Sequence, residues 1–355
     1  MVAGGDVQAE GFYTRPYGIS PDGAHVFYVA DQLTDQAFEL FSVSIDASAG
    51  PVRLNAPLPA GGDVDTSTPT FTADGTRIMF IAEQNSDDIA ELLSAPSDGS
   101  ASPTSLTPSL DPGPVVGDVT AFHVLPGGTR ALYLADQETD GLFELYSVTL
   151  TAHPSVTKLS EPANGTVETD FKFTPDGSTV LFRARVSNTR DLYAVPAAGG
   201  SAPLRLSGPF VGGLGLFTDF ALSADGSRAV YWADQDSTQL ELYSVPVDGS
   251  ASAVRLSPSG SLSDLRLFVI SPDSASVAYL VTMSPAHREL YLSPIDASLA
   301  PVKLSGTLIA GGNVQSFQFG SGGTRVAFLA DALVDQQNEL FSAPLDGSSR
   351  VRLSA

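Results

Sequence analysis

The sequence contains no cysteine and only three lysines among its 355 residues. Without cysteine the chain forms no disulfide and no thiolate-based site. Its 18 Lys and Arg residues stand against 40 Asp and Glu residues, which gives a formal net charge of −22 at pH 7. So few cations cannot neutralise many phosphates, which excludes nucleic acid and anionic membrane surfaces as main partners.

Long hydrophobic runs are also lacking. No apolar stretch approaches the ~20 residues that span a bilayer, and residues 1–10 do not read as a signal peptide. Hydrophobic residues still make up 43% of the chain, enough for a large core. We therefore expect a folded protein that does not insert into membranes.

A turn motif of the form S-P-D-G recurs along the whole sequence at steps of 48 to 53 residues. Its seven copies begin at Ser20, Thr72, Leu125, Thr174, Ser223, Ser271 and Gly320. Self-similarity at this period indicates a repeat architecture. We predict a single domain over residues 1–355, with repeats that start near 12, 64, 117, 167, 216, 264 and 313, although length alone suggests two or three domains.

Each repeat carries four short strand signals separated by Asp-Gly type turns, and no segment reads as a helix. Four antiparallel strands repeated seven times predict an all-β fold, a seven-bladed β-propeller of four-stranded antiparallel blades. Of the 30 aromatic residues, 19 lie at fixed positions of the repeat, where we expect them to pack between blades rather than to stack on a ligand.

The S-P-D-G turn and the run E-L-Y-S-V-P-V-D-G-S at residues 241–250 resemble the TolB-like β-propellers, which are relatives of WD repeats. Similar propellers occur in prolyl-oligopeptidase-type peptidases. The resemblance covers the whole chain and implies blade geometry rather than an activity. TolB carries a further α/β domain and the peptidases a hydrolase domain with a G-x-S-x-G motif, and the sequence contains neither.

A carboxylate recurs at one place in all seven repeats: Glu39, Glu91, Glu144, Asp191, Glu241, Glu289 and Glu339. A cation follows thirteen or fourteen residues later in six of them: Arg53, Lys158, Arg205, Arg255, Lys303 and Arg352. An Asp-Gly turn lies midway, and residues equidistant from a hairpin turn face each other. We therefore predict directly opposed ion pairs that set the strand register, each contributing about 0–1 kcal/mol if exposed, rather than metal ligands.

Acidic residues also gather in the loops between second and third strands, several of which begin with A-D-Q. One interpretation is that each Asp binds backbone N–H groups of its own loop. The alternative is a weak Ca²⁺ site or an acidic surface for a basic partner, although the spacing matches no EF-hand. The calcium candidates are Asp31, Asp35, Asp136, Asp140, Asp234, Asp236, Asp331 and Asp335.

Basic residues that depart from the repeat concentrate in the fourth and sixth copies. Together with an apolar connection over residues 208–217, they suggest a ligand-binding patch on the loop face for an acidic or amphipathic peptide or an anionic sugar. Its candidate residues are Lys172, Arg183, Arg185, Arg190, Phe210, Phe217, His287 and Arg288. The alternative is local compensation, in which Arg183 pairs with Asp170 or Asp219.

Catalysis finds little support, because the four histidines are spread over the repeats; His123 with Lys172 is the one acid–base pair considered. We predict a non-catalytic binding or scaffold propeller that recognises a protein or peptide at the loop face and channel mouth. The alternatives are a carbohydrate-binding or polysaccharide-lyase-like propeller, or the propeller part of a larger cell-surface protein or peptidase.

No cofactor is expected apart from the Ca²⁺ alternative. A monomer outside the cytoplasm is expected, periplasmic, secreted or at the cell surface, whose signal peptide is not in this chain.

Overall fold

The computed structural model describes residues 17–66, 69–110, 117–160, 165–186, 188–213, 215–258, 267–284 and 287–354, which contain strands and no helix. Two of the predicted repeat boundaries, near residues 12 and 264, lie outside these ranges. So do Arg15 and Arg266, two basic residues that depart from the repeat. The chain divides into two compact units, residues 1–169 with 196–202 and residues 170–195 with 203–355, and each is described by itself. In the described part of the chain, no helix has the length and apolar character to cross a membrane.

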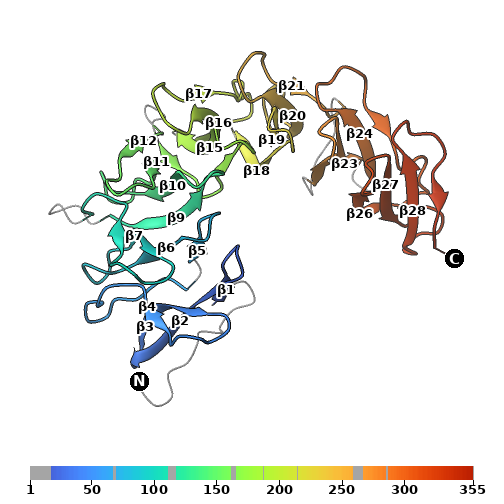
Figure 1. Cartoon of the computed structure of the whole chain (residues 1–355). Helices are drawn as coiled ribbons and strands as arrows, with labels where there is room; N and C mark the ends of the chain where they lie inside the picture. Colours follow the sequence, from blue (N-terminus) through green and yellow to red (C-terminus); the bar gives the residue numbers. More distant parts are fainter. Residues whose placement is uncertain are drawn as a thin grey trace. The chain divides into compact units, whose positions relative to one another are not determined.

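Three sheets precede residue 160 (Figure 1). The first consists of β1 (Tyr17–Ile19), β2 (His25–Thr34), β3 (Ala37–Ser44) and β4 (Val52–Arg53). The second consists of β5 (Thr70–Phe71), β6 (Arg77–Ala82), β7 (Glu91–Pro96) and β8 (Thr104–Ser105). The third consists of β9 (Val119–Val124), β10 (Arg130–Ala135), β11 (Glu144–Thr149) and β12 (Val156–Lys158), and the short β13 (Thr166–Val167) follows it.

Four further sheets follow. The fourth contains β14 (Lys172–Phe173), β15 (Thr179–Val186), β16 (Thr189–Pro196) and β17 (Leu204–Arg205). The fifth contains β18 (Leu216–Leu222), β19 (Arg228–Ala233), β20 (Glu241–Pro246) and β21 (Val254–Arg255). The sixth contains β22 (Phe268–Ile270), β23 (Ser276–Ser284), β24 (His287–Pro294) and β25 (Val302–Lys303), and the seventh β26 (Val314–Phe319), β27 (Arg325–Ala330), β28 (Glu339–Pro344) and β29 (Val351–Arg352).

In six sheets the strands that are neighbours in sequence are also neighbours in the sheet, and in the fourth sheet β14 and β16 pair with β15. The described pairings are antiparallel, as between β1 and β2 and between β10 and β11. The predicted all-β architecture is therefore confirmed: the described residues form the seven four-stranded sheets of a seven-bladed β-propeller. This arrangement puts the S-P-D-G and D-G-S turns at one end of each sheet, the turn face. The loops between second and third strands lie at the other end, the loop face.

The core lies between consecutive sheets. Phe27, Val29 and Leu40 of the first sheet pack against Phe80 and Leu93 of the second, and all five are buried. The aromatics of second and third strands stack within their own sheets, with ring centroids 5.1 Å apart for Tyr133–Tyr146 and 6.2 Å for Tyr279–Tyr291. The predicted packing role is confirmed at these positions.

The prediction is wrong for the first-strand aromatic Tyr17, which is 59% exposed. Its counterparts Phe171 and Phe220 are buried. The repeat position alone therefore does not decide whether a first-strand aromatic is covered.

The six predicted ion pairs all form, but in a different register. Arg255 lies opposite Tyr243, two residues beyond Glu241, and reaches back diagonally to the Glu241 carboxylate at 3.3 Å. The hairpin is centred on Gly249, which has φ +67°, and not on Asp248. Each residue therefore lies opposite a residue two positions away from the predicted one. The other pairs are Arg53–Glu39, Lys158–Glu144, Arg205–Asp191, Lys303–Glu289 and Arg352–Glu339.

In each pair the carboxylate side chain is less exposed than the cation, so the value of about 0–1 kcal/mol that holds for an exposed pair does not describe them. The Glu241 side chain is 1% exposed and that of Arg255 is 34% exposed. A carboxylate that loses its partner in such a place carries a large desolvation cost. In the second sheet, which lacks the cation, Asn85 Nδ2 donates to Glu91 Oε2 at 2.6 Å, and burial raises the Glu91 pKa.

Whether the second oxygen of this carboxylate accepts a hydrogen bond depends on the aromatic residue two positions later in the strand. The hydroxyls of Tyr146, Tyr243 and Tyr291 donate to their own sheet's glutamate at 3.0 to 3.1 Å. Burial and the nearby Glu289 carboxylate raise the pKa of Tyr291 to about 12. Where the aromatic is phenylalanine, as in the first and seventh sheets, Glu39 Oε2 and Glu339 Oε2 are buried without a hydrogen bond.

We therefore expect Phe41→Tyr and Phe341→Tyr each to stabilise the protein by about 1 kcal/mol, because a hydroxyl satisfies a buried carboxylate oxygen. The matched opposite change, Tyr243→Phe, should cost a similar amount. Urea unfolding of the three variants measures both effects. A loss of stability in both Phe→Tyr variants would contradict the assignment.

The aspartates of the turn face are held ionised by their own turns. Ser271 Oγ donates to Asp273 Oδ1 at 2.6 Å and Ala275 N at 3.1 Å, and these bonds lower the Asp273 pKa. In the D-G-S turns the bonds from Ser250 likewise lower the pKa of Asp248. The same direction holds in eight more turns, at Asp22, Asp46, Asp74, Asp98, Asp176, Asp225, Asp296 and Asp346.

A carboxyl whose pKa is lowered by folding stabilises the protein above its unfolded pKa, about 3.9 for Asp, and this contribution is lost as the pH falls through the folded value. We expect the free energy of unfolding to decrease steadily from pH 5 to pH 3. In Asp74→Asn this decrease should be shallower. Urea titrations at each pH measure the slope, and an unchanged slope in Asp74→Asn would contradict the prediction.

Candidate functional site

The A-D-Q aspartates lie at the loop face and bind backbone N–H groups. Asp136 accepts from Gly141 N at 2.8 Å and from Asp118 N at 2.6 Å, and thereby joins its own loop to the start of the first strand. Asp331 does the same with Gln336 N and Asn313 N, and Asp31 accepts from Gln36 N and Asp234 from Gly215 N. The interpretation of these residues as caps of their own loops is confirmed at Asp31, Asp136 and Asp331, whereas the described bond of Asp234 goes to the start of the first strand.

The residue at the start of the first strand then links consecutive sheets. Asp63 Oδ1 accepts from Phe38 N at 2.7 Å, and Asp118 Oδ1 accepts from Ala90 N at 2.8 Å. Asn313 Oδ1 accepts from Arg288 N at 2.9 Å in the same way. Each bond joins one sheet to the third strand of the sheet before it, so the loop face of each unit is a connected framework.

The remaining calcium candidates are Asp35, Asp140, Asp236 and Asp335, of which Asp236 lies 3.9 Å from Arg255 Nη1. In the ranges that the structure describes, no three His, Asp or Glu side chains are grouped to hold a metal ion. The calcium hypothesis stays a prediction, which a rise in melting temperature at millimolar Ca²⁺ would support.

An acidic recess of about 580 Å³ opens at the loop face between the second and third sheets. Its floor is apolar and includes Ile81 and Val119. Five carboxylates surround it: Asp63, Asp65, Glu83, Asp88 and Asp118. Neither Lys nor Arg is among the described residues that line it.

The crowding of charge in this recess is visible at Glu83. Burial raises its pKa, and the neighbouring carboxylates of Asp87, Asp63 and Asp88 raise it further. Asp63 N donates to Glu83 Oε2 at 3.3 Å, which fixes the carboxylate at the rim. A bound cation would relieve this repulsion, so the recess is suited to a positively charged group.

The basic residues of the predicted patch lie on several elements of the second unit. Arg183, on β15, is buried and forms an ion pair with Asp170 at 2.8 Å, which is the local compensation considered above. Arg185, further along β15, is exposed. Lys172 Nζ lies 5.1 Å from the centre of the Phe220 ring, and Arg190 is half-buried on β16.

The other patch residues have partners of their own. His287 Nδ1 lies 3.2 Å from Gly312 O, and Arg288 Nη2 lies 3.5 Å from Gln315 Oε1. The Phe210 ring lies 5.6 Å from the Arg205 guanidinium, and Phe217 is 37% exposed. The described contacts join none of the fourth-sheet residues to His287 or Arg288, so the patch stays a prediction.

Because Arg183 is 10% exposed and paired, we expect Arg183→Met to destabilise the protein by about 2 kcal/mol by leaving Asp170 without its cation. Arg183→Met combined with Asp170→Asn should recover part of the loss. A double-mutant cycle in urea measures the coupling, and additive effects would show that the pair contributes nothing.

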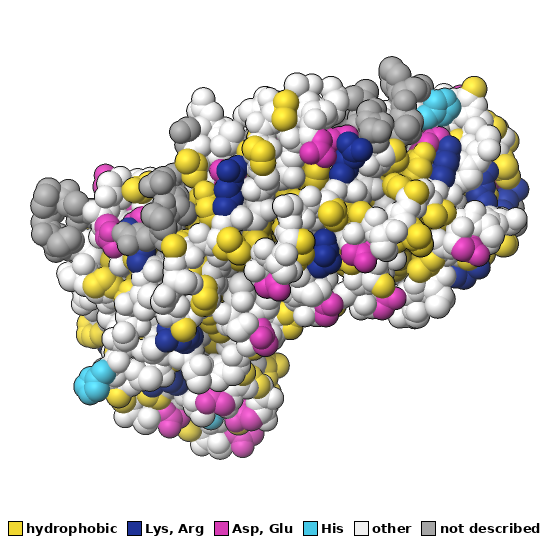
Figure 2. Space-filling view, turned by 90° about the horizontal axis from the view of Figure 1, so that it is seen from above, with side chains coloured by type: hydrophobic (Ala, Val, Ile, Leu, Met, Phe, Trp, Pro, Cys, Tyr) yellow, Lys and Arg dark blue, Asp and Glu magenta, His cyan; other side chains and the backbone are white. Residues whose placement is uncertain are grey.

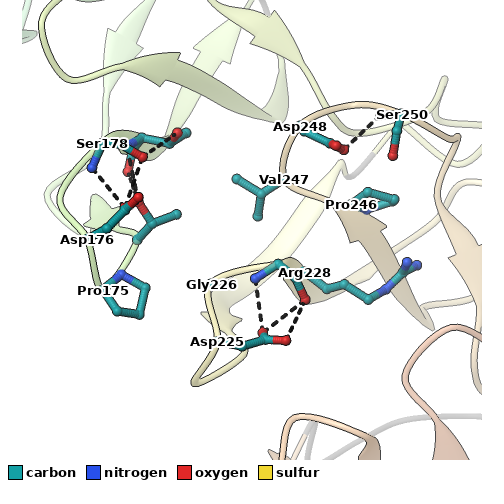
Figure 3. Close-up of a pocket in the computed structure, with 13 residues that line it drawn as sticks. Pro175, Asp176, Ser178, Asp225, Gly226, Arg228, Pro246, Val247, Asp248 and Ser250 are labelled. Atoms are coloured by element: carbon teal, nitrogen blue, oxygen red, sulfur yellow. Dashed lines mark hydrogen bonds between the residues drawn. The ribbon is translucent and has the colours of Figure 1, made fainter.

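A second recess, of about 600 Å³, lies at the turn face between the fourth and fifth sheets. Three turns converge on it (Figure 3), with Asp176 and Ser178 on one side, Asp248 and Ser250 opposite, and Asp225 at the third turn. Pro175, Pro246 and Val247 add an apolar part to the lining. Each of the three aspartates uses Oδ1 to bind its own turn.

Neither recess was predicted from the sequence. The pairs Asp63-Val64 and Asp118-Val119 carry the one available signal, an acidic residue before the first strand. Their partners in the recess, such as Glu83, lie elsewhere in the sequence, so only folding brings them together. Figure 2 shows one face of the molecule, with basic side chains among acidic, hydrophobic and uncharged ones.

No protein-family model matches the chain, and no curated protein matches it. Solved structures do. Dipeptidyl peptidase 4 of Porphyromonas gingivalis is 12% identical with a TM-score of 0.53, over 96% of this chain and 52% of that one. TolB of Acinetobacter baumannii is 16% identical over 94% of this chain and 81% of its own, with a TM-score of 0.36.

The β-propeller domain of the Trilobed protease of Pyrococcus furiosus is 11% identical over 97% of this chain and 98% of its own, with a TM-score of 0.38. The match to the Porphyromonas gingivalis peptidase, with a TM-score of 0.53, shows a likeness of fold. The chain spans about half the length of the peptidase from Porphyromonas gingivalis.

Proposed function

We propose that this chain is a non-catalytic binding propeller that recognises a basic segment of a protein at the acidic recess of its loop face. The observation that carries the proposal is the crowding of carboxylates at Glu83, where Asp63, Asp87 and Asp88 raise its pKa beside a recess that no lysine or arginine lines. A recess lined by one sign of charge concentrates the opposite sign and speeds its association.

The framework of the recess supports this proposal. Asp63 and Asp118 are held by backbone N–H groups of the preceding sheet, through Oδ1 in each case. Fixed carboxylates bind a cation without losing side-chain entropy at that moment. The volume, about 580 Å³, admits one or two long basic side chains rather than a folded surface.

This proposal replaces the basic patch as the main binding surface, because Arg183 is already neutralised by Asp170. It retains the predicted protein or peptide partner and the location outside the cytoplasm. The similarity to peptidase propellers favours a second candidate, in which the chain is the propeller part of a larger protein. In that case the recess would guide a basic segment toward the rest of that protein.

The test uses the double variant Glu83→Gln with Asp88→Asn, which keeps hydrogen-bonding shape and removes two charges. Asp88 has φ +64°, a conformation that asparagine tolerates. We expect binding of a fluorescein-labelled peptide of alternating Gly and Arg to weaken about tenfold, since each surface charge pair contributes at most about 1 kcal/mol. Fluorescence anisotropy at 50 mM salt measures the dissociation constant.

The matched control is Asp46→Asn with Asp98→Asn, which removes two charges from the turn face of the same unit. It should change the dissociation constant less than twofold. Equal weakening in both double variants, or equal binding of a peptide of alternating Gly and Glu, would contradict the proposal. A peptide that does not bind the wild type at all would also contradict it.

A further inference from the structure

An arginine at the start of the second strand recurs in four sheets and binds its own third strand. Arg77 Nε donates to Ser94 Oγ at 2.7 Å, and Arg228 Nε donates to Ser244 Oγ at 2.7 Å. Arg325–Ser342 and Arg130–Ser147 are built in the same way. The serines are buried, so the guanidinium lies over the third strand, on the side that faces the next sheet.

An acidic turn of the next sheet acts on this guanidinium. Arg228 and Asp296 interact electrostatically, and Asp296 belongs to the turn Asp296-Ala297-Ser298 of the sixth sheet. In the first sheet His25 takes the position of the arginine and interacts in the same way with Asp98 of the second sheet. In two places, therefore, a basic group at the start of a second strand interacts with a turn aspartate of the next sheet.

The fourth sheet lacks both members of the arginine–serine pair. Thr179 stands at the arginine position and Ala194 at the serine position, and both side chains are smaller. The sixth sheet also lacks the pair, but there Leu292 replaces the serine and adds volume beside Ser276. Only the fourth sheet loses volume at both positions.

The turn-face recess lies where this volume is missing. Thr179 lines it, and so does Asp248 of the fifth sheet, which holds the repeat position that Asp296 holds in the sixth. The recess thus joins Asp248 to a place where four other sheets have an arginine and the fourth sheet has none, and Arg228 of the fifth sheet also lines it. The hydroxyls of Ser178 and Ser250 and the carboxylate of Asp176 add further hydrogen-bond acceptors.

We propose that the turn-face recess between the fourth and fifth sheets binds an arginine side chain of a partner protein. The guanidinium takes the place that the chain's own arginines fill between other sheets, with Asp248 and Asp176 as its acceptors. Pro175, Pro246 and Val247 contact the aliphatic part of that arginine or its neighbours. Figure 3 shows these groups around one opening.

Guanidinium fits this recess better than ammonium does. In the sheets that keep the arginine, Nε and Nη2 of one side chain reach Oγ and O of the same serine, as Arg77 does with Ser94 at 2.7 and 2.9 Å. A planar fork with several donors meets such paired acceptors, whereas lysine offers a single charged point. The site is therefore expected to prefer arginine over lysine.

The test fills the recess from within by Thr179→Arg with Ala194→Ser, which installs the pair that Arg228 and Ser244 form in the next sheet. This variant should fold and melt at or above the temperature of the wild type. Calorimetric titration with the peptide acetyl-Gly-Ser-Arg-Ser-Gly-amide should show binding to the wild type and at least tenfold weaker binding to the filled variant. Titrations are made with Glu83→Gln and Asp88→Asn present, so that the loop-face recess does not contribute.

The matched control is Ser276→Arg with Leu292→Ser in the sixth sheet, which should bind the peptide as the wild type does. A second variant, Asp248→Asn, keeps the acceptor for Ser250 N and should weaken binding several-fold, whereas Asp296→Asn should not. Unchanged binding by the filled variant would overturn the proposal. Equal binding of the same peptide with lysine or glutamine in place of arginine would also overturn it. So would the absence of saturable binding by the wild type up to millimolar peptide.

Discussion

Within each unit, consecutive sheets cover each other's apolar side chains, and the rest of the structure depends on this burial. The buried aromatic and aliphatic side chains of consecutive sheets, such as Phe27 and Leu40 against Phe80 and Leu93, show this requirement. Register is therefore under strong constraint, because a shift of one residue would turn an apolar set to solvent. The buried carboxylate of the third strand, as at Glu241, and its diagonal cation maintain that register in a chain without cysteine.

The same constraint determines where binding sites can arise. Loop-face aspartates are engaged by backbone N–H groups within a sheet and by the preceding sheet, so most of the negative charge has a structural use. Charge that exceeds this use collects around Glu83. At the turn face the proposed site comes from a missing interaction. Thr179 and Ala194 stand where other sheets have an arginine and a serine that bind each other.

Much of the fold could be predicted, and the reasons are local. The S-P-D-G turns need a residue with positive φ, as Gly226 with φ +72° shows, and such residues are visible in the sequence. The cation thirteen or fourteen residues after each carboxylate could be counted, although its register could not. Whether the hairpin is centred on Asp248 or Gly249 depends on turn geometry, which shifts every partner by two residues.

The candidate sites could be predicted much less well. Arg183 stood out as a departure from the repeat, but its pairing with Asp170 depends on the distance between two strands and could be stated only as an alternative. Asp63 and Asp118 did not stand out, since an acidic residue before a strand is common in this chain. Their meaning comes from the recess that they share with Glu83.

The sequence by itself determined the repeat, the seven sheets, the turn positions and the partners of the six ion pairs, because each rests on spacing along the chain. Tertiary structure alone decided which carboxylates are buried, which aspartates remain without a cation and where a missing side chain leaves a recess. Those outcomes depend on side chains from different sheets that meet in space, and no regular spacing along the chain records their meeting.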